Sequence, residues 1–457
     1  MDYSAANGQL WNAIIQFGLI AGAILLANYL RQTLSFIRKS MLPVAVLGGF
    51  LLLIVKQLGI VRIDDNLMEI LTYHGIALGF IAMSLRVPDG DSSSSEGLVG
   101  LRSGAVIVSS YMVQGVTGLL ITVLLSLTVM PGLFPAAGML LPMGYGQGPG
   151  QANNIGGSYQ SMGFEGGHSF ALAIAAMGYI VACIVGVVIL NVLRKQGRLG
   201  DISELKEEHY DASYFHSPDE IPVSESVDKL SVQLAMVILV YLATFAAAWG
   251  ITSGIASVSA GIAGTVNTLI WGFNFIIGAA LAMLLRVILE KLRAAGRIRR
   301  RYQNNYLLNR LSGAFFDIMI VAGISSINIQ DIRGLVLPFI LLTVIGGIVT
   351  WLHLAFVCKA VYPDYYYEGL ISMFGMMTGT ISSGVLLLRE IDPAMRTPAA
   401  TNLITGSSFG ILLGAPILVL VGLAPKSITM CFVTIGLVCA YLVILDLIIF
   451  KAGRRKK

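Results

Sequence analysis

Charged residues are scarce in this sequence. They make up 12% of its 457 residues, while 56% of the residues are hydrophobic and the mean hydropathy is +0.80. A soluble protein carries about 25% charged residues and needs them to cover its water-facing surface. The scarcity excludes a soluble enzyme, a nucleic-acid-binding protein and a secreted disulfide scaffold. It indicates a membrane protein that has the lipid bilayer as its main partner.

Cysteines are few, and the motifs of nucleotide-driven or hydrolytic chemistry are missing. The four cysteines lie in apolar stretches without a C-x-x-C pair, so we expect buried thiols and no zinc site. The sequence contains no Walker, H-E-x-x-H or G-x-S-x-G motif. We therefore expect no enzyme activity, no cofactor and no ATP-driven step.

Apolar stretches of about 20 residues recur along the chain, and each is long enough to cross a hydrocarbon core about 30 Å thick. The ten-residue alternating segments of an outer-membrane barrel are absent. We predict eleven spanning helices, near residues 11–30, 41–58, 71–85, 103–129, 168–193, 230–249, 266–289, 312–327, 335–358, 399–423 and 428–450. Two further segments, 133–162 and 368–388, are interrupted by glycine and polar residues. We interpret both as re-entrant broken hairpins.

The positions of Lys and Arg set the expected orientation. With the N-terminus outside and the C-terminus cytoplasmic, all but four of the 30 basic residues lie in the cytoplasm. The exceptions are Lys56, Arg62, Arg333 and Lys426. If either broken segment were a crossing, the predicted orientation of every later helix would be reversed, and basic residues of the later loops or the C-terminal tail would lie outside. We therefore predict a multi-pass protein of the inner (plasma) membrane.

A polar stretch divides the chain into two halves of similar plan. We predict a first repeat over residues 1–194, a cytoplasmic linker over 195–229, a second repeat over 230–424, and an extra C-terminal helix with a basic tail over 425–457. Five crossings are an odd number, so the repeats have opposite orientations. The predicted fold is an all-α polytopic membrane protein with two inverted-topology repeats of five transmembrane helices, each with a re-entrant broken hairpin, plus the extra helix. This plan is typical of secondary transporters.

The two hairpins carry matching glycine motifs. Aligning Gly144 of MGYGQGPG with Gly375 of FGMMTGT also aligns Gly148 with Gly379. Close helix packing is the ordinary alternative for G-x-x-x-G. However, non-helical backbone is tolerated at membrane depth only where protein or water meets it, which favours a binding site. We predict that the substrate contacts Gly146, Gln147, Gly148, Gly150, Gln151, Asn153, Asn154, Thr378, Gly379, Thr380, Ser382 and Ser383.

Asp317 lies inside a predicted spanning helix, where a carboxylate is costly and is usually functional. Ser325 and Asn328 follow at spacings that return to the same helix face. We predict that these three residues hold a coupling ion, although Asp317 could instead pair with Arg310. His168, like the other histidines near helix ends, is a weaker candidate for a proton relay.

The glycine apices, the order of helices and the position of the linker resemble the bacterial sodium:glutamate symporter family and, more remotely, the 2-hydroxycarboxylate transporters. GYGQGPG (Gly144 to Gly150) resembles the first family apex and GMMTG (Gly375 to Gly379) the second, over about residues 12–424. Gln147 and Pro149 replace a His and a Thr that are typical of the family, and Met377 replaces a Gly. The resemblance implies sodium coupling, a homodimer and an elevator mechanism.

The predicted function is therefore sodium-coupled symport of a small anionic solute, such as glutamate or a related amino acid or dicarboxylate. A proton-coupled carboxylate carrier and a passive ion channel are alternatives. A membrane sensor that uses the linker as its output is a further alternative from another class.

Overall fold

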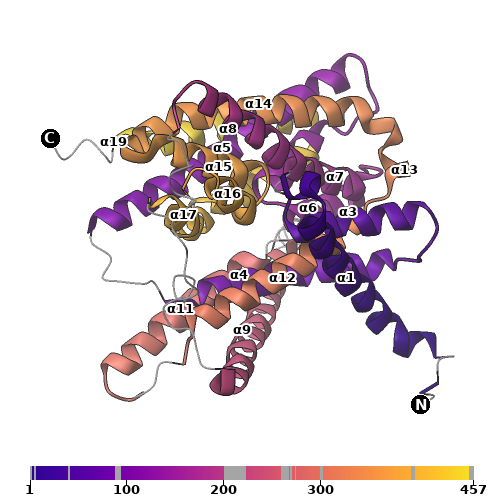
Figure 1. The fold of residues 1–457 in the computed structure, drawn as a ribbon. Coiled ribbons are helices and arrows are strands. Elements are labelled where there is room, and N and C mark those ends of the chain that lie inside the picture. Colours follow the sequence, from indigo (N-terminus) through magenta and orange to yellow (C-terminus); the bar gives the residue numbers. More distant parts are fainter. Residues whose placement is uncertain are drawn as a thin grey trace. The chain divides into compact units, whose positions relative to one another are not determined.

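The computed structural model describes residues 3–4, 7–39, 42–87, 94–199, 223–258, 267, 270–272, 274–298, 302–392 and 397–451. All regular elements in these residues are helices (Figure 1), as the sequence predicts. The predicted linker lies largely outside the described residues, which resume at α9 (Val223–Val258).

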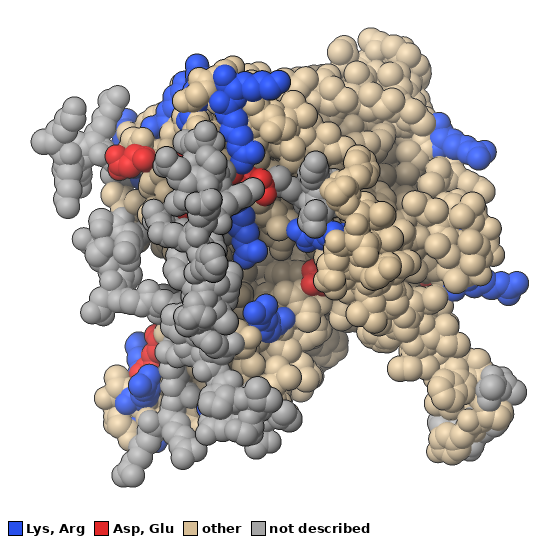
Figure 2. Space-filling view, viewed as in Figure 1, with Lys and Arg blue, Asp and Glu red and all other residues tan. Residues whose placement is uncertain are grey.

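Among the described residues, eight helical stretches are long and apolar enough to cross a bilayer. They are α1 (Gly8–Thr33), α4 (Asp65–Ser84), α5 (Ser94–Leu127), the run α7 (Gly167–Ile180)–η3 (Val181–Val185)–α8 (Gly186–Lys195), α9, α12 (Asn305–Ser325), the run α13 (Ile329–Ile332)–η6 (Arg333–Leu335)–α14 (Val336–Val361), and α19 (Ile428–Lys451). Figure 2 shows a face with broad areas that carry no charged side chain, as lipid-facing surface requires. The chain is a multi-pass membrane protein.

The structure differs from the eleven predicted crossings in two places, and a third predicted crossing lies partly outside the described residues. The predicted span 41–58 forms α3 (Val44–Gln57), whose 14 residues reach only about 21 Å. The predicted span 399–423 is bent by 49° between α17 (Ala399–Leu413) and α18 (Ala415–Leu423). Part of 266–289 lies outside the described residues, which resume with α11 (Asn274–Ala294). Hydropathy alone does not show where an apolar run bends or stops.

Two compact units divide the chain. Unit 1 comprises Met1–Thr72, Ser93–Gly200 and Ile320–Lys457, and unit 2 comprises Tyr73–Ser92 and Asp201–Met319. In unit 2, the apolar faces of α4, α9, α11 and α12 form a core of Ile81, Ala82, Leu85, Val237, Val240, Ala282 and Leu308. Both broken segments belong to unit 1.

The first broken segment runs through η1 (Pro135–Met139), η2 (Pro142–Gly146) and α6 (Pro149–Ser161). Its two ends meet, because the ring of Phe134 lies 5.4 Å from that of Tyr159 and 5.2 Å from that of Phe164. The chain reverses at Gln147 and Gly148, where the helical geometry stops. The segment is therefore a hairpin with a glycine tip.

The second broken segment consists of α15 (Tyr366–Thr378) and α16 (Ile381–Leu388), which lie side by side with α17 (Figure 1). Their glycines allow close approach, since a Cβ on Gly375 would lie 2.8 Å from Cα of Gly384. Gly379 separates the two helices. This segment is also a hairpin, with its tip at residues 379–380.

Three of the four cysteines are buried as the sequence predicts, and one is not. Cys183, Cys358 and Cys431 are buried free thiols, whereas Cys439 is exposed. The expectation that all four are buried is wrong for Cys439, because it lies on a face of α19 that no described helix covers.

Candidate functional site

The tips of the two hairpins meet inside unit 1. A Cβ built on Gly148 would lie 3.4 Å from Cγ2 of Thr380 and 3.9 Å from the carbonyl oxygen of Gly379. The same position lies 3.7 Å from the hydroxyl oxygen of Tyr179 on α7. The structure thus brings together three residues predicted for the substrate site, Gly148, Gly379 and Thr380. We call this place the tip junction.

Local chemistry explains the shape of the first tip. Gly148 has φ +78° and ψ −171°, a conformation that is open essentially only to glycine. Pro149 then starts α6, where its fixed φ suits the first helical position and its missing N–H costs nothing. The sequence G-P therefore both ends one segment and begins the next.

Each tip is followed by a helix whose N-terminus has no side-chain cap. Neither Gly148 before α6 nor Thr380 before α16 makes a capping hydrogen bond. The N–H groups in the first turn of a helix have no partner within that helix, and they carry a partial positive charge. Two such termini at one junction favour an anion, as carboxylates and phosphates are commonly bound in this way.

Buried polar atoms without a partner surround these termini. Within the described residues, both side-chain polar atoms of Gln151, Oγ1 of Thr380 and Oγ of Ser383 are buried and make no hydrogen bond. Gln151 is 1% exposed and Ser383 is 0% exposed. Each unpaired buried polar group lowers the free energy of unfolding by about 1–3 kcal/mol. Several such groups close together therefore need an explanation. A polar ligand at the junction would supply the missing partners.

Gln114 holds the second tip in place, although the sequence analysis did not single it out. Its Nε2 donates to the carbonyl of Met377 at 2.9 Å and to Oγ1 of Thr350 at 3.0 Å. Its Oε1 is buried without a hydrogen bond from any described residue, and it lies 3.1 Å from the Cβ position of Gly146. The available signal was an amide in the middle of the apolar helix α5.

The remaining predicted contact residues face elsewhere or are already bonded. Gln147 reaches Met143 Sδ at 3.8 Å, Thr378 donates to the carbonyl of Phe374, and Ser382 is exposed. Gly146 packs on Tyr111, and Gly150 is buried in the first turn of α6. Asn153 and Asn154 belong to a second polar cluster farther along α6.

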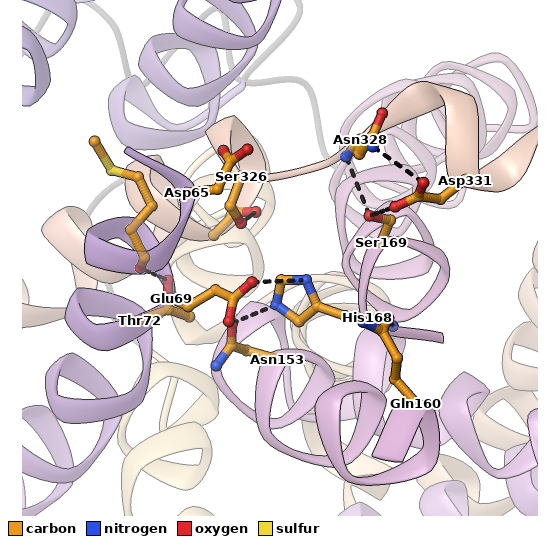
Figure 3. A network of polar contacts seen from close by, with 12 residues as sticks. Asp65, Glu69, Thr72, Asn153, Gln160, His168, Ser169, Ser326, Asn328 and Asp331 are labelled. Carbon is orange, nitrogen blue, oxygen red and sulfur yellow. Dashed lines mark hydrogen bonds and ion pairs between the residues drawn. The ribbon is translucent and has the colours of Figure 1, made fainter. Parts of the chain in front are cut away.

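This second cluster is centred on His168 of α7 (Figure 3). Its Nε2 lies 2.8 Å from Oδ1 of Asn153, and its Nδ1 lies 3.4 Å from Oε1 of Glu69 on α4. Asn153 Nδ2 in turn donates to Oδ1 of Asn154 at 3.4 Å. We call these residues, together with those of the next paragraph, the histidine network.

The histidine network continues to α3 and α13. Asp331 accepts from Oγ of Ser169 at 3.0 Å and from Nδ2 of Asn328 at 3.0 Å (Figure 3). Lys56 pairs with Asp65 at 2.6 Å, and its Nζ also lies 3.3 Å from the carbonyl oxygen of Ser325. Residues of α3, α4, α6, α7 and α13, with the C-terminal end of α12, therefore meet in one polar network within unit 1.

The three predicted ion ligands do not share one helix. Asp317 is exposed and belongs to unit 2, while Ser325 and Asn328 belong to unit 1. Helix α12 ends at Ser325, and Asn328 has extended backbone (φ −100°, ψ 108°) where it caps α13. The structure thus corrects the expectation that Asn328 shares a helix face with the other two, and their role as ion ligands remains a prediction. No group of three His, Cys, Asp or Glu side chains among the described residues is arranged to hold a metal.

The chain matches no protein-family model and no curated protein.

Proposed function

We propose that the chain is a secondary active transporter that binds a small anionic solute at the tip junction. The observation that carries the proposal is the meeting of two uncapped helix N-termini, from opposite halves of the chain, at buried polar atoms without partners. The substrate class is a carboxylate such as glutamate, a related amino acid or a dicarboxylate. The helix termini would bind its negative charge, and Gln151, Thr380 and Ser383 would bind its other polar groups.

The membrane arrangement is part of the proposal. The two hairpins enter the bilayer from opposite leaflets in two inverted repeats, and the N-terminus is outside the plasma membrane. The matching positions of Gly148 and Gly379 at the tips support this arrangement, because interrupted helices that meet near the midplane are typical of secondary transporters. Sodium coupling, an elevator movement and a homodimer are what the family resemblance adds.

Coupling requires that the substrate and the driving ion bind together, so that neither alone lets the loaded site change sides. This mutual dependence is a coupling free energy between two sites, and each ligand strengthens the binding of the other by the same factor. The empty junction, with its unpartnered dipoles, would be less stable than the loaded one.

A passive channel is the alternative, and the burial of the junction argues against it. A channel needs a hydrated path past its filter. Here Gln151 and Ser383 are almost completely inaccessible to solvent. An occluded polar site favours a carrier that opens to one side at a time.

Uptake into proteoliposomes tests the proposal, with L-glutamate and succinate as probes. Saturable uptake that follows an imposed sodium gradient is the expected result. Ser383→Ala and Thr380→Val should raise KM by about tenfold, which corresponds to the loss of one hydrogen bond of about 1.4 kcal/mol. Neither change removes a hydrogen bond that the described residues make, so the unfolding temperature without substrate should stay the same or rise.

Ser408→Ala is the matched control, because among the described residues this exposed hydroxyl bonds only to the carbonyl of Ile404 in its own helix. It should leave KM unchanged. Single-channel currents in planar bilayers, or equal effects of the control and the tip variants, would contradict the carrier.

A further inference from the structure

The contacts of His168 favour one placement of its hydrogens. Asn153 uses its Nδ2 as a donor to Asn154, so its Oδ1 is the atom that faces His168 Nε2. An amide oxygen can only accept, and Nε2 must therefore carry a hydrogen. In a neutral imidazole, the other nitrogen, Nδ1, is then an acceptor without hydrogen.

That second nitrogen faces a carboxylate. Oε1 of Glu69 lies 3.4 Å from Nδ1 of His168, and an ionised carboxylate also only accepts. Two acceptors with facing lone pairs repel each other. The contact becomes favourable when one proton lies on either partner, as an imidazolium beside a carboxylate or as a carboxylic acid that donates to imidazole.

We propose that the Glu69–His168 pair is a proton-binding site, and that binding of the anionic substrate is linked to uptake of one proton there. This linkage rests on the proposed function, whereas the proton site itself does not. A proton from water adds to the pair and changes its net charge from −1 to 0, and the same proton returns to water on release.

Of the carboxylates near His168, Glu69 is the one that the proton would satisfy, because the others have partners of their own. Lys56, Asp65 and Asp331 are the other charged side chains that act on His168. Lys56 and Asp65 pair with each other, and Asp331 accepts from Ser169 and Asn328. Each of the other two carboxylates therefore has partners of its own.

The exposures of the two partners suit proton exchange. The side chain of Glu69 is 46% exposed, while that of His168 is 9% exposed. The carboxylate is thus partly exposed, and the imidazole lies behind it in the protein. A proton can arrive through Glu69 and be held between Glu69 and His168.

Two routes connect this pair to the tip junction. Asn153, which accepts from His168, lies in the second turn of α6, the helix that starts at Pro149 of the first tip. Thr72 lies nearly one turn beyond Glu69 on α4. It and Pro149 both pack against Gly323: a Cβ built on Gly323 would lie 3.4 Å from Cγ2 of Thr72 and 3.1 Å from Cβ of Pro149. Protonation removes a negative charge beside the helix that binds the anion, so substrate affinity should rise at acidic pH.

The first measurement needs no substrate. The unfolding temperature of the purified full chain is followed from about pH 4 to about pH 8, a range that covers the ordinary pKa values of glutamate and histidine. Wild type should lose stability relative to Glu69→Gln as the pH rises, because the native pair has to give up its proton. His168→Gln, which keeps a donor for Asn153 but cannot titrate, should show the same profile as Glu69→Gln.

The second measurement is the KM for L-glutamate and succinate over the same pH range, at saturating sodium. Wild-type KM should fall by up to about tenfold for each unit of acidification, the limit for one linked proton. Glu69→Gln should make KM independent of pH. Glu165→Gln, an exposed carboxylate in the turn after α6, removes the same charge outside the network and should keep the wild-type profile.

The outcomes separate the two proposals. If Glu69→Gln and His168→Gln keep the wild-type pH profiles, or if Glu165→Gln abolishes them equally, the proton site is refuted. If the stability profiles behave as expected but no uptake of either probe occurs, the proton site stands and the transport proposal fails.

Discussion

Gly148 and Thr380 face each other at the tip junction, although they belong to opposite halves of the chain. A Cβ on Gly148 would just touch the methyl group of Thr380, at 3.4 Å. This pair is the point at which two separate glycine motifs become one site.

Gly148→Ala should lower the free energy of unfolding by about 1–3 kcal/mol, because a residue with a Cβ is strained at φ +78° and ψ −171°. It should also reduce substrate uptake, since relief of the strain would move the start of α6. Thermal unfolding and proteoliposome uptake measure the two effects. Gly157→Ala in the middle of α6 has open space for its Cβ and should be neutral or slightly stabilising. Equal behaviour of the two variants would contradict the role of the tip geometry.

Gln114→Leu should destabilise the protein by about 1–3 kcal/mol, because the buried carbonyl of Met377 loses its donor. The second tip would then be held less firmly, so uptake should fall as well. Ser126→Ala on the same helix is the control, as the one bond of its hydroxyl to a described residue is to the carbonyl of Val123 in α5. The prediction fails if the uptake of the Gln114 variant matches that of the control.

Arg102 joins the ends of two helices. Its guanidinium donates to the carbonyl of Ala360 at 2.6 Å, near the end of α14, and to that of Ile449 at 2.8 Å, near the end of α19. Arg102→Ala should cost about 1.5–3 kcal/mol of stability, the range for hydrogen bonds from a charged group. Arg102→Lys should restore little, because an ammonium cannot span both carbonyls as the planar fork does. Thermal unfolding measures both, and Lys195→Ala, exposed at the end of α8, should show no loss.

Asp64 should make stability depend on pH at the acidic end. The amide of Asn12, at 2.6 Å, and the N–H of Leu67 hold the pKa of its carboxyl below the usual value. A lowered pKa in the folded state means that the stabilisation is complete above the ordinary pKa and is lost as the pH falls through the folded value. The unfolding temperatures of wild type and Asp64→Asn should therefore differ at neutral pH and converge in acid. A constant difference would show that the charge of Asp64 is not what stabilises this turn.

Much of the site could be found in the sequence because its determinants are local. Gly148 and Pro149 specify a chain reversal by themselves, and Gly379 interrupts an otherwise apolar helix. Gln151, Thr380 and Ser383 stand out as polar residues beside these breaks. Gln114 and the pairing of Glu69 with His168 could not be found in this way, because each depends on which helices become neighbours.

The amino-acid sequence by itself determined that the chain is a helical membrane protein with two glycine-tipped interruptions, since hydropathy and backbone restrictions act within a few residues. Only the tertiary structure decided that the two tips meet, that α12 stops before Asn328, and that His168 lies between a carboxylate and an amide. Such contacts depend on the packing of segments far apart in the chain, and no local preference of the residues encodes that packing.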